Sequence, residues 1–452
     1  MGDYLDEALK QAKSRAASRD RRTSPDAKPI RVREDLPPPP GFFPREPETF
    51  TEAGLDRGFV EGLLLKHLLN NRGMIGRNIA QALALPIDPT KALLQDMKLR
   101  KLVVHRSATA TGDFLYDLAG EGHHEARLLQ EQARYAAEAP VPLAEYLESV
   151  EIQNVSGSVP TLDDLRRCLG DLDINDQMLR RLGPAIASGK GLFLYGPPGN
   201  GKTSIARRLN DVYDKCIYIP RYVSVSGSVL RVFDPHVHKV AIDPRDVYRK
   251  LDRRWVRCER PCVIAGGELT LDSLEVQYDE VMGVCEAPLQ LKANCGTLVL
   301  DDFGRQRVEA TDLLNRWIVP MENRVDYLRM PDGKSIEVPF DPFLIFSTNL
   351  DPAALVDEAF LRRIPYKIRI GDPDEAAFRR LLQVHADEMG LQVEAGAFDY
   401  LLTQHFANRP MRFCHPRDLL RQVRDQQSFV GAALMVDKTT IDEAIDTYFA
   451  SL

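Results

Sequence analysis

Residues 192–204 read Leu-Phe-Leu-Tyr-Gly-Pro-Pro-Gly-Asn-Gly-Lys-Thr-Ser, and the rest of the chain can be interpreted outward from them. The first four residues are mostly apolar and predict a short buried strand. The glycines and prolines that follow predict a tight loop, and the residues from Thr203 onward have the spacing of an amphipathic helix. A strand, a loop and a helix are therefore expected in immediate succession.

The loop matches the pattern Gly-x-x-x-x-Gly-Lys-Thr, which runs here from Gly196 to Thr203. Its glycines let successive backbone N–H groups point at one anion, and the helix N-terminus adds partial positive charge. Lys202 is expected to reach the outer phosphates of a nucleotide, and the Thr203 hydroxyl to bind Mg²⁺. The residues expected to contact the nucleotide are Gly196, Pro197, Pro198, Gly199, Asn200, Gly201, Lys202, Thr203 and Ser204.

Length and composition limit the alternatives. A chain of 452 residues with 44% apolar residues is expected to form two or three domains. The net charge of −7 provides no overall basic field for nucleic acid. The N-terminus lacks a signal pattern and no apolar run reaches the roughly 18 residues that a membrane span needs, so a cytoplasmic protein without a membrane span is expected. His236 and His238 are expected to face solvent in a loop.

The first third of the chain predicts an arm and a small domain. Residues 1–50 are highly charged and end near a run of four prolines, which predicts a disordered arm. Residues 51–138 predict three helices followed by a β-hairpin, an order that resembles a winged helix. The third helix carries polar residues that could contact phosphates and base edges of DNA: Thr90, Lys91, Gln95, Lys98 and Arg100. Any solvated helix face shows such residues, and this fold also docks proteins, so both interpretations stay open.

Two later strands are expected to end in the polar residues that a nucleotide site needs. The apolar residues 298–300 lead directly into Asp301 and Asp302. The first acid would hold Mg²⁺ through water, and the second would orient and deprotonate the attacking water. A strand over residues 343–348 leads to Asn349, whose side chain could hold that water or sense the γ-phosphate.

Further along, residues 358–364 predict a short helix that carries Arg362 and Arg363 side by side. After Gly371 the pattern is purely helical. Four helices are expected, with Arg417 at the start of the third: residues 374–389, 395–404, 415–427 and 438–449.

These elements resemble, in their order, the AAA+ ATPases over residues 143–452. The resemblance implies an α/β P-loop NTPase fold over residues 139–372, a C-terminal helical lid over 373–452, and the winged-helix-like α+β domain over 51–138 in front of them. It also implies binding of ATP and Mg²⁺ between neighbouring subunits of a ring, expected to be a hexamer.

The resemblance assigns roles to individual residues. Lys202 and Thr203 would belong to Walker A, and Asp301 and Asp302 would be the Walker B acids. Asn349 would be sensor 1. Either Arg362 or Arg363 would be the arginine finger that completes the neighbour's site, and Arg417 would be sensor 2, the lid's contact with the γ-phosphate.

Residues 324–338 form two strand-like halves around a Pro-Asp-Gly turn and resemble the hairpin inserted before sensor 1 in MoxR-type ATPases, magnesium chelatases and enhancer-binding activators. In such rings this hairpin and the loop near residues 277–284 face the pore; a surface hairpin without a client is the alternative.

Three functions are weighed. The first is a Mg²⁺-dependent ATPase ring that remodels a protein partner in the manner of MoxR-type chaperones. The second is a DNA-directed ATPase that binds duplex through the winged helix. The third is a nucleotide-gated scaffold with little turnover, because Asp302 is one methylene shorter than the usual Glu.

Overall fold

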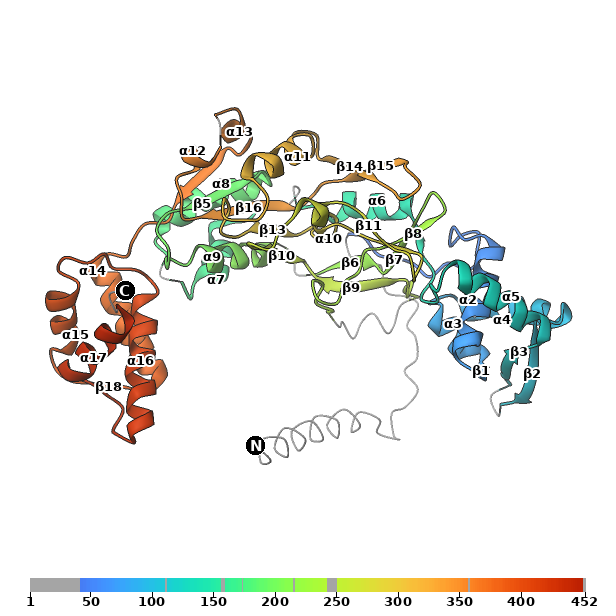
Figure 1. Ribbon diagram of the computed structural model, residues 1–452, viewed down its shortest axis with the longest axis horizontal. Helices are drawn as coiled ribbons and strands as arrows, with labels where there is room; N and C mark the ends of the chain where they lie inside the picture. Colours follow the sequence, from blue (N-terminus) through green and yellow to red (C-terminus); the bar gives the residue numbers. More distant parts are fainter. Residues whose placement is uncertain are drawn as a thin grey trace.

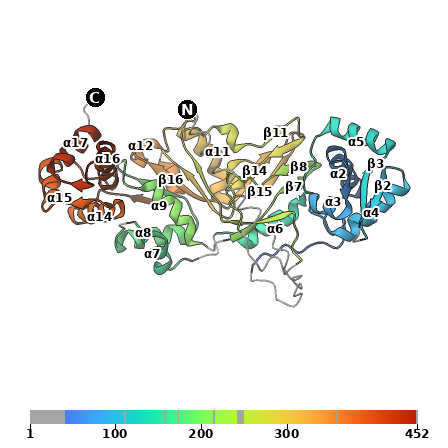
Figure 2. The same cartoon turned by 90° about the horizontal axis from the view of Figure 1, so that it is seen from below.

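The structure is a computed structural model and describes residues 41–109, 112–155, 159–172, 174–213, 216–241, 250–356 and 358–449. Figures 1 and 2 show three parts: an N module (residues 50–138, blue), a core (139–372) and a lid (373–449, red). The N module and the lid lie at opposite ends of the core in both views. Within the described ranges, no helix is both long enough and apolar enough to cross a bilayer.

The N module contains the three helices and the hairpin that were expected, with one short strand added. Its elements are α2 (Arg57–Asn70), β1 (Met74–Ile75), α3 (Gly76–Ala82), α4 (Ile87–Leu99), β2 (Val103–Ala108), β3 (Phe114–Leu118) and α5 (Gly120–Gln132). The strands form a sheet in the order β1-β3-β2. Apolar residues of α2 and α4 such as Leu64 and Leu94 form its buried core.

Thr90 of α4 does not lie on the exposed polar face where the sequence predicted it. Thr90 is fully buried, and its hydroxyl donates a hydrogen bond of 2.7 Å to the carbonyl of Pro86 one turn earlier. Because this side chain points into the N module, it is not available to phosphates or base edges.

The disordered arm expected over residues 1–50 is wrong for the last of these residues. Residues 1–40 lie outside the described ranges, but the chain from residue 42 packs against the core. The ring of Phe42 lies 4.9 Å from that of Trp255, and the backbone N–H of Asp252 donates to the carbonyl of Pro44 at 3.1 Å. Burial of these apolar side chains therefore holds the segment from Phe42 to Pro44 on the core.

The core is built on a parallel sheet with helices on both faces. The sheet has five strands in the order β10 (Cys262–Ala265), β13 (Thr297–Leu300), β16 (Phe343–Thr348), β5 (Leu192–Tyr195) and β17 (Tyr366–Arg369). One face packs against α7 (Leu162–Leu169), α8 (Asp176–Ser188) and α9 (Lys202–Leu209), and the other against α11 (Ala310–Asn323) and α13 (Glu358–Arg363). Burial on both faces explains why these strands are apolar runs without alternation. A short helix, α12 (Pro352–Leu355), precedes α13.

The core also contains a second sheet of five strands. Its order is β11 (Gln277–Asp279), β12 (Val284–Glu286), β8 (Ser228–Arg231), β7 (Tyr222–Val225) and β4 (Val141–Pro142). Beside it lie the paired strands β6 (Cys216–Pro220) and β9 (Trp255–Glu259), and the helices α6 (Leu143–Gln153) and α10 (Leu289–Lys292).

The hairpin predicted over residues 324–338 is confirmed, as strands β14 (Val325–Arg329) and β15 (Ser335–Pro339). One of its faces is buried, because Leu328, Ile336 and Val338 pack into the apolar cluster of the second sheet together with Tyr146 of α6. The other face is exposed at Tyr327. The hairpin is therefore held to the second sheet along its length and exposes its turn.

His238 is buried, which corrects the expectation of a solvent-facing residue. Its Nδ1 accepts a hydrogen bond of 2.9 Å from the backbone N–H of Asp234, and its Nε2 lies 2.8 Å from the carbonyl of Lys292. His236, two residues earlier, is exposed as predicted. The His238 ring is thus packed inside the loop that it closes, whereas His236 faces solvent.

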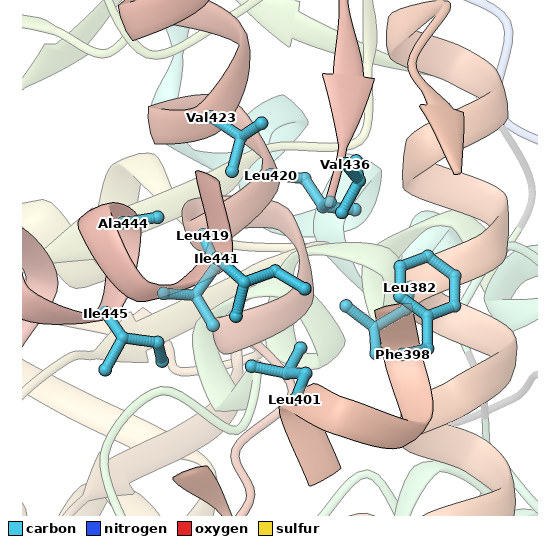
Figure 3. A pocket seen from close by; sticks show the side chains of 10 residues that line it. All are labelled: Leu382, Phe398, Leu401, Leu419, Leu420, Val423, Val436, Ile441, Ala444 and Ile445. Atoms are coloured by element: carbon cyan, nitrogen blue, oxygen red, sulfur yellow. The ribbon is translucent and has the colours of Figure 1, made fainter. Parts of the chain in front are cut away.

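The lid contains the four predicted helices and, unlike the prediction, a pair of short strands. Its elements are α14 (Glu375–Met389), β18 (Gln392–Val393), α15 (Ala397–Tyr400) with a π-helical turn (Leu401–His405), α16 (His415–Val430), β19 (Met435–Val436) and α17 (Lys438–Tyr448). Figure 3 shows apolar side chains from these elements meeting in its centre, for example Leu382, Leu420 and Ile441. The cavity that they leave is only about 10 Å³, so the lid has a packed core of its own.

Candidate nucleotide-binding site

The loop between β5 and α9 needs its glycines for two different reasons. Gly196, Gly199 and Gly201 have φ angles of +135°, +79° and +76°, values that side-chain-bearing residues rarely adopt. A Cβ at Gly196 would also lie 2.3 Å from the carbonyl oxygen of Ile370. Gly201 has open space around it and caps the N-terminus of α9, so there only the backbone angle requires glycine.

The position of β5 in the sheet explains why the loop can form a site. The chain leaves β5, returns as β10 at the far edge, and approaches β5 again through β13 and β16, while β17 lies on the other side of β5. The strand order therefore reverses at β5. Ligands of open parallel sheets bind at the carboxyl ends of the strands at such a switch point. The loop, Asp301 and Asn349 all follow those strand ends.

Lys202 is buried at the mouth of the loop. Its ammonium donates to the carbonyls of Gly196 (3.0 Å) and Pro197 (2.9 Å) and to Oδ1 of Asn349 (2.6 Å). Burial lowers the pKa of this ammonium, and the negative charges of Asp301 and Asp302 oppose that shift. The three acceptors hold the nitrogen between the loop and the end of β16.

The acidic residues accept hydrogen bonds from Thr203 and from Asn349. The Thr203 hydroxyl lies 3.0 and 2.9 Å from the two carboxylate oxygens of Asp301. Hydroxyl and carboxylate oxygens are the ligands that Mg²⁺ takes in phosphate-binding sites, so this pair fits that ion. The amide of Asn349 donates to Oδ1 of Asp302 at 3.2 Å, so Asn349 joins Lys202 to Asp302.

Asp302 has an unusual backbone. Its φ is +50°, in the left-handed region that disfavours side-chain-bearing residues. Neighbouring bonds hold it there: the Asp301 N–H donates to Ala265 (2.9 Å) and the Phe303 N–H to Ser347 (2.8 Å). The exposed Asp302 side chain thus leaves the strand end in a direction that a regular strand would not give it.

The arginines predicted for the site have different surroundings. Arg363 donates to Oε1 of Glu322 at 2.6 Å and lies over the ring of Phe360. The neighbouring Arg362 is exposed, and its side chain has no hydrogen bond or ion pair to the residues that the structure describes. Arg417 lies in the first turn of α16, where its guanidinium pairs with Asp418 rather than with a residue of the P-loop.

The lid reaches the P-loop through residues that the sequence did not indicate. The backbone N–H of Cys414 donates to the carbonyl of Gly199 at 3.0 Å, and that of Phe413 to Oδ1 of Asn200 at 3.2 Å. Arg412 forms an ion pair with Asp372, in the segment that joins core and lid. In both of these backbone hydrogen bonds the donor and the acceptor lie more than two hundred residues apart in the chain, and no sequence pattern predicts such pairs.

Taken together, the strand order and the side-chain contacts of Lys202 and Thr203 define an α/β P-loop fold with the residues of a nucleotide site, an arrangement like that of the AAA+ ATPases. Comparisons with known proteins agree with that class. The chain is 25% identical over 233 residues to a vesicle-fusing ATPase of Arabidopsis thaliana, which covers 50% of this chain and 25% of that protein. It is 24% identical over 247 residues to the probable 26S proteasome regulatory subunit 10B of Caenorhabditis elegans, covering 53% and 47%. The chain thus spans less than half the length of these relatives.

A family model described as a domain of unknown function (DUF8689) matches residues 374–447, which are the lid. Among solved structures, the Thermotoga maritima RuvB Holliday junction branch migration motor is 13% identical with a TM-score of 0.36, over 63% of this chain and 73% of that one. A RuvB mutant from the same organism is 12% identical with a TM-score of 0.35, over 66% and 72%.

Proposed function

We propose that this protein hydrolyses ATP with Mg²⁺ in a ring of subunits and uses the cycle to remodel a protein partner. The observation that carries the proposal is that two hydrogen-bonded sets of side chains, Lys202–Asn349–Asp302 and Thr203–Asp301, stand at the carboxyl ends of three adjacent strands. These side chains supply what phosphoryl transfer to water needs: a cation, metal ligands and a group that orients the nucleophile.

Each residue has a role that its surroundings support. Lys202 would exchange its contacts with the loop carbonyls and Asn349 for the outer phosphates. Thr203 and Asp301 would hold Mg²⁺, which when bound neutralises charge on the phosphates. Asp302 would accept the proton of the attacking water, and Asn349 would fix the orientation of that carboxylate through its amide.

The surroundings of the two adjacent arginines favour Arg362 as the arginine finger. A finger must extend into the neighbour's site, and Arg362 is exposed without a partner among the described residues. Arg363 would first have to leave Glu322, at 2.6 Å. Such a finger stabilises charge in the transition state, so hydrolysis would depend on ring assembly. We propose a hexamer, as in the family that the sequence resembles.

Two exposed segments are proposed to contact the protein partner. One is the turn of the β14–β15 hairpin, at Pro331 to Lys334. The other is β11 with the turn that follows it, where Tyr278, Val281 and Met282 are exposed close together in the chain, as apolar side chains at interaction sites are. The carbonyls of Val281 and Met282 accept hydrogen bonds from residues 134 and 135 at the end of the N module, which links the two parts.

The ion pairs of α4 weigh against the alternative of duplex binding by the N module. Lys91 lies 3.4 Å from Asp113, and Lys98 lies 3.1 Å from a ring nitrogen of His105. Arg100 pairs with Glu61 at 2.7 Å and with Asp96 at 2.9 Å. Contacts with DNA phosphates would have to compete with these partners, so we place protein docking first and keep DNA binding as the second candidate.

The deciding experiment measures the ATPase rate per subunit against protein concentration. A rate that rises with concentration, falls about 10³-fold in Arg362→Ala and changes far less in Arg363→Ala supports the ring ATPase. Phosphate release that is absent at every concentration, with Mg²⁺ and ATP present, refutes it.

Duplex DNA is added in a parallel series at low salt. A rate that rises several-fold there, and only with Lys98 and Arg100 intact, would move the DNA-directed function to first place.

A further inference from the structure

The lid rests on the P-loop through a loop of three residues, Arg412 to Cys414. The N–H of Cys414 donates to the carbonyl of Gly199 at 3.0 Å. This approach is so close that a Cβ at Gly199 would lie 2.5 Å from the Cys414 sulfur. The lid thus contacts the turn of the P-loop itself, which is the part expected to surround the phosphates of a nucleotide.

Asn200 is the centre of the contact. It is buried, and its amide nitrogen donates to the carbonyl of Gly371 (3.1 Å) and to Oδ1 of Asp372 (2.7 Å). Its amide oxygen accepts from the N–H of Phe413 at 3.2 Å. One side chain of the P-loop therefore binds both the segment that joins core and lid and the lid itself. A buried amide with both donors and its oxygen engaged is costly to disturb.

Arg412 closes the ring of contacts. Its guanidinium pairs with Asp372, whose Oδ1 also accepts from Asn200. The Arg412 side chain is only 20% exposed, whereas that of Arg417 is 53% exposed and pairs with the adjacent Asp418. The half-buried pair is the one that can restrain the lid, because exposed neighbouring pairs contribute little.

The lid loop is supported from behind by a cluster of rings. Nδ1 of His415 accepts a hydrogen bond of 3.2 Å from the N–H of Arg412. The His415 ring packs against Phe406, Tyr448 and Phe449, with centroids 5.2 to 5.7 Å apart. The backbone of Arg412 is thereby fixed to the packed core of the lid, so a contact made by Arg412 restrains the lid as a whole.

These contacts leave the anion-binding groups free. Their donors are the Asn200 amide, the Arg412 guanidinium and the N–H groups of Phe413 and Cys414; none is a backbone N–H of the P-loop. A nucleotide could therefore occupy the loop with the contacts intact. Holding the lid against the P-loop would then slow both the opening of the site and the departure of a bound nucleotide.

We propose that Asn200, Asp372 and Arg412 form a latch that holds the lid on the P-loop and sets the rate at which ADP leaves. This inference rests on the proposed nucleotide site. The three are positioning residues: they act on the nucleotide through the position of the lid, and they take no part in the chemical step.

The test measures release of a fluorescent ADP analogue by rapid mixing with excess ATP, using the full chain. Arg412→Gln and Asp372→Ala should each speed release about fivefold, the effect of losing one partly exposed ion pair. The double variant should gain no more than the faster single variant, since both break the same pair. Asp372→Asn, which can still accept from Asn200 but loses its charge, should be intermediate. Arg424→Gln is the matched control, because Arg424 of helix α16 in the lid pairs, among the described residues, only with its neighbour Asp425.

A second readout separates the latch from general damage. The single-turnover rate of ATP hydrolysis should stay within about twofold of the wild-type rate in both single variants, because no group of the chemical step changes. Unchanged release in Arg412→Gln and Asp372→Ala overturns the latch while the nucleotide site stands. Equal losses of hydrolysis and of nucleotide retention also overturn it, since they indicate a disrupted site. If the wild-type chain binds no nucleotide, the proposed function fails and the latch fails with it.

Discussion

Replacing His415 by phenylalanine should remove most of the acid sensitivity of the lid. The His415 ring is buried among Phe406, Tyr448 and Phe449 at the start of α16. Burial lowers the pKa of His415 from 6.5 to about 4, and the positive charge of Arg412 acts in the same direction. The native lid thus keeps this imidazole neutral at a pH at which the unfolded chain would protonate it.

The size of the effect follows from the two pKa values. Between pH 6.5 and about pH 4 the unfolded chain binds one proton more than the folded chain at this site, so stability falls as the pH falls. From pH 7 to pH 5 the loss amounts to about 2 kcal/mol, or roughly a 30-fold change in the opening equilibrium. Below about pH 4 both states are protonated, and this residue adds no further loss.

Hydrogen–deuterium exchange of residues 415–430 measures this equilibrium in the full chain. After correction for the intrinsic pH dependence of exchange, protection of α16 should fall about 30-fold from pH 7 to pH 5 in the wild type and far less in His415→Phe. The variant also loses the bond from the Arg412 N–H, which lowers protection equally at both pH values. Equal pH dependence in the two proteins would refute the assignment of a buried neutral histidine.

Three further outcomes are expected. Lys202→Ala should weaken ATP binding by about 2 kcal/mol, roughly 30-fold in Kd by titration calorimetry, through loss of its charge-assisted contacts; unchanged affinity would contradict its role at the phosphates. Gly199→Ala should lower stability by about 1 to 2 kcal/mol in thermal unfolding, because its φ is +79° and the new Cβ meets Cys414; a wild-type Tm would contradict this. In a double-mutant cycle by chemical denaturation, Arg363→Ala and Glu322→Ala should show a coupling of about 0.5 to 1 kcal/mol, whereas full additivity would rule out their ion pair in solution.

The sequence was sufficient for features that depend on neighbouring residues. The P-loop follows from the glycines of residues 196–201, because left-handed backbone angles favour glycine wherever the loop lies in a protein. The buried strands β13 and β16 and the hairpin of residues 325–339 follow from apolar runs and a turn signal. The four lid helices likewise follow from their periodicity, with ends close to those observed.

Features that depend on packing between distant segments were not predictable. In the second sheet, β7–β8 and β11–β12 are local antiparallel pairs, but β4 pairs with β7 and β8 pairs with β12 across tens of residues of chain. Thr90 resembles a surface residue in sequence but is fully buried, where its hydroxyl donates to the carbonyl of Pro86. His238 is drawn into its loop by Asp234 and by Lys292, which lies 54 residues away.

The candidate site shows the same division. Sequence alone determined which residue types stand at the strand ends, since Lys202, Thr203, Asp301 and Asn349 belong to short local motifs. Only the tertiary structure distinguished Arg362 from Arg363 by the ion pair with Glu322. The tertiary structure alone also revealed that Asn200 binds Asp372, 172 residues away in the chain. Local patterns encode backbone shape and burial, whereas the partner of a polar side chain depends on which distant segment the packed core brings to it.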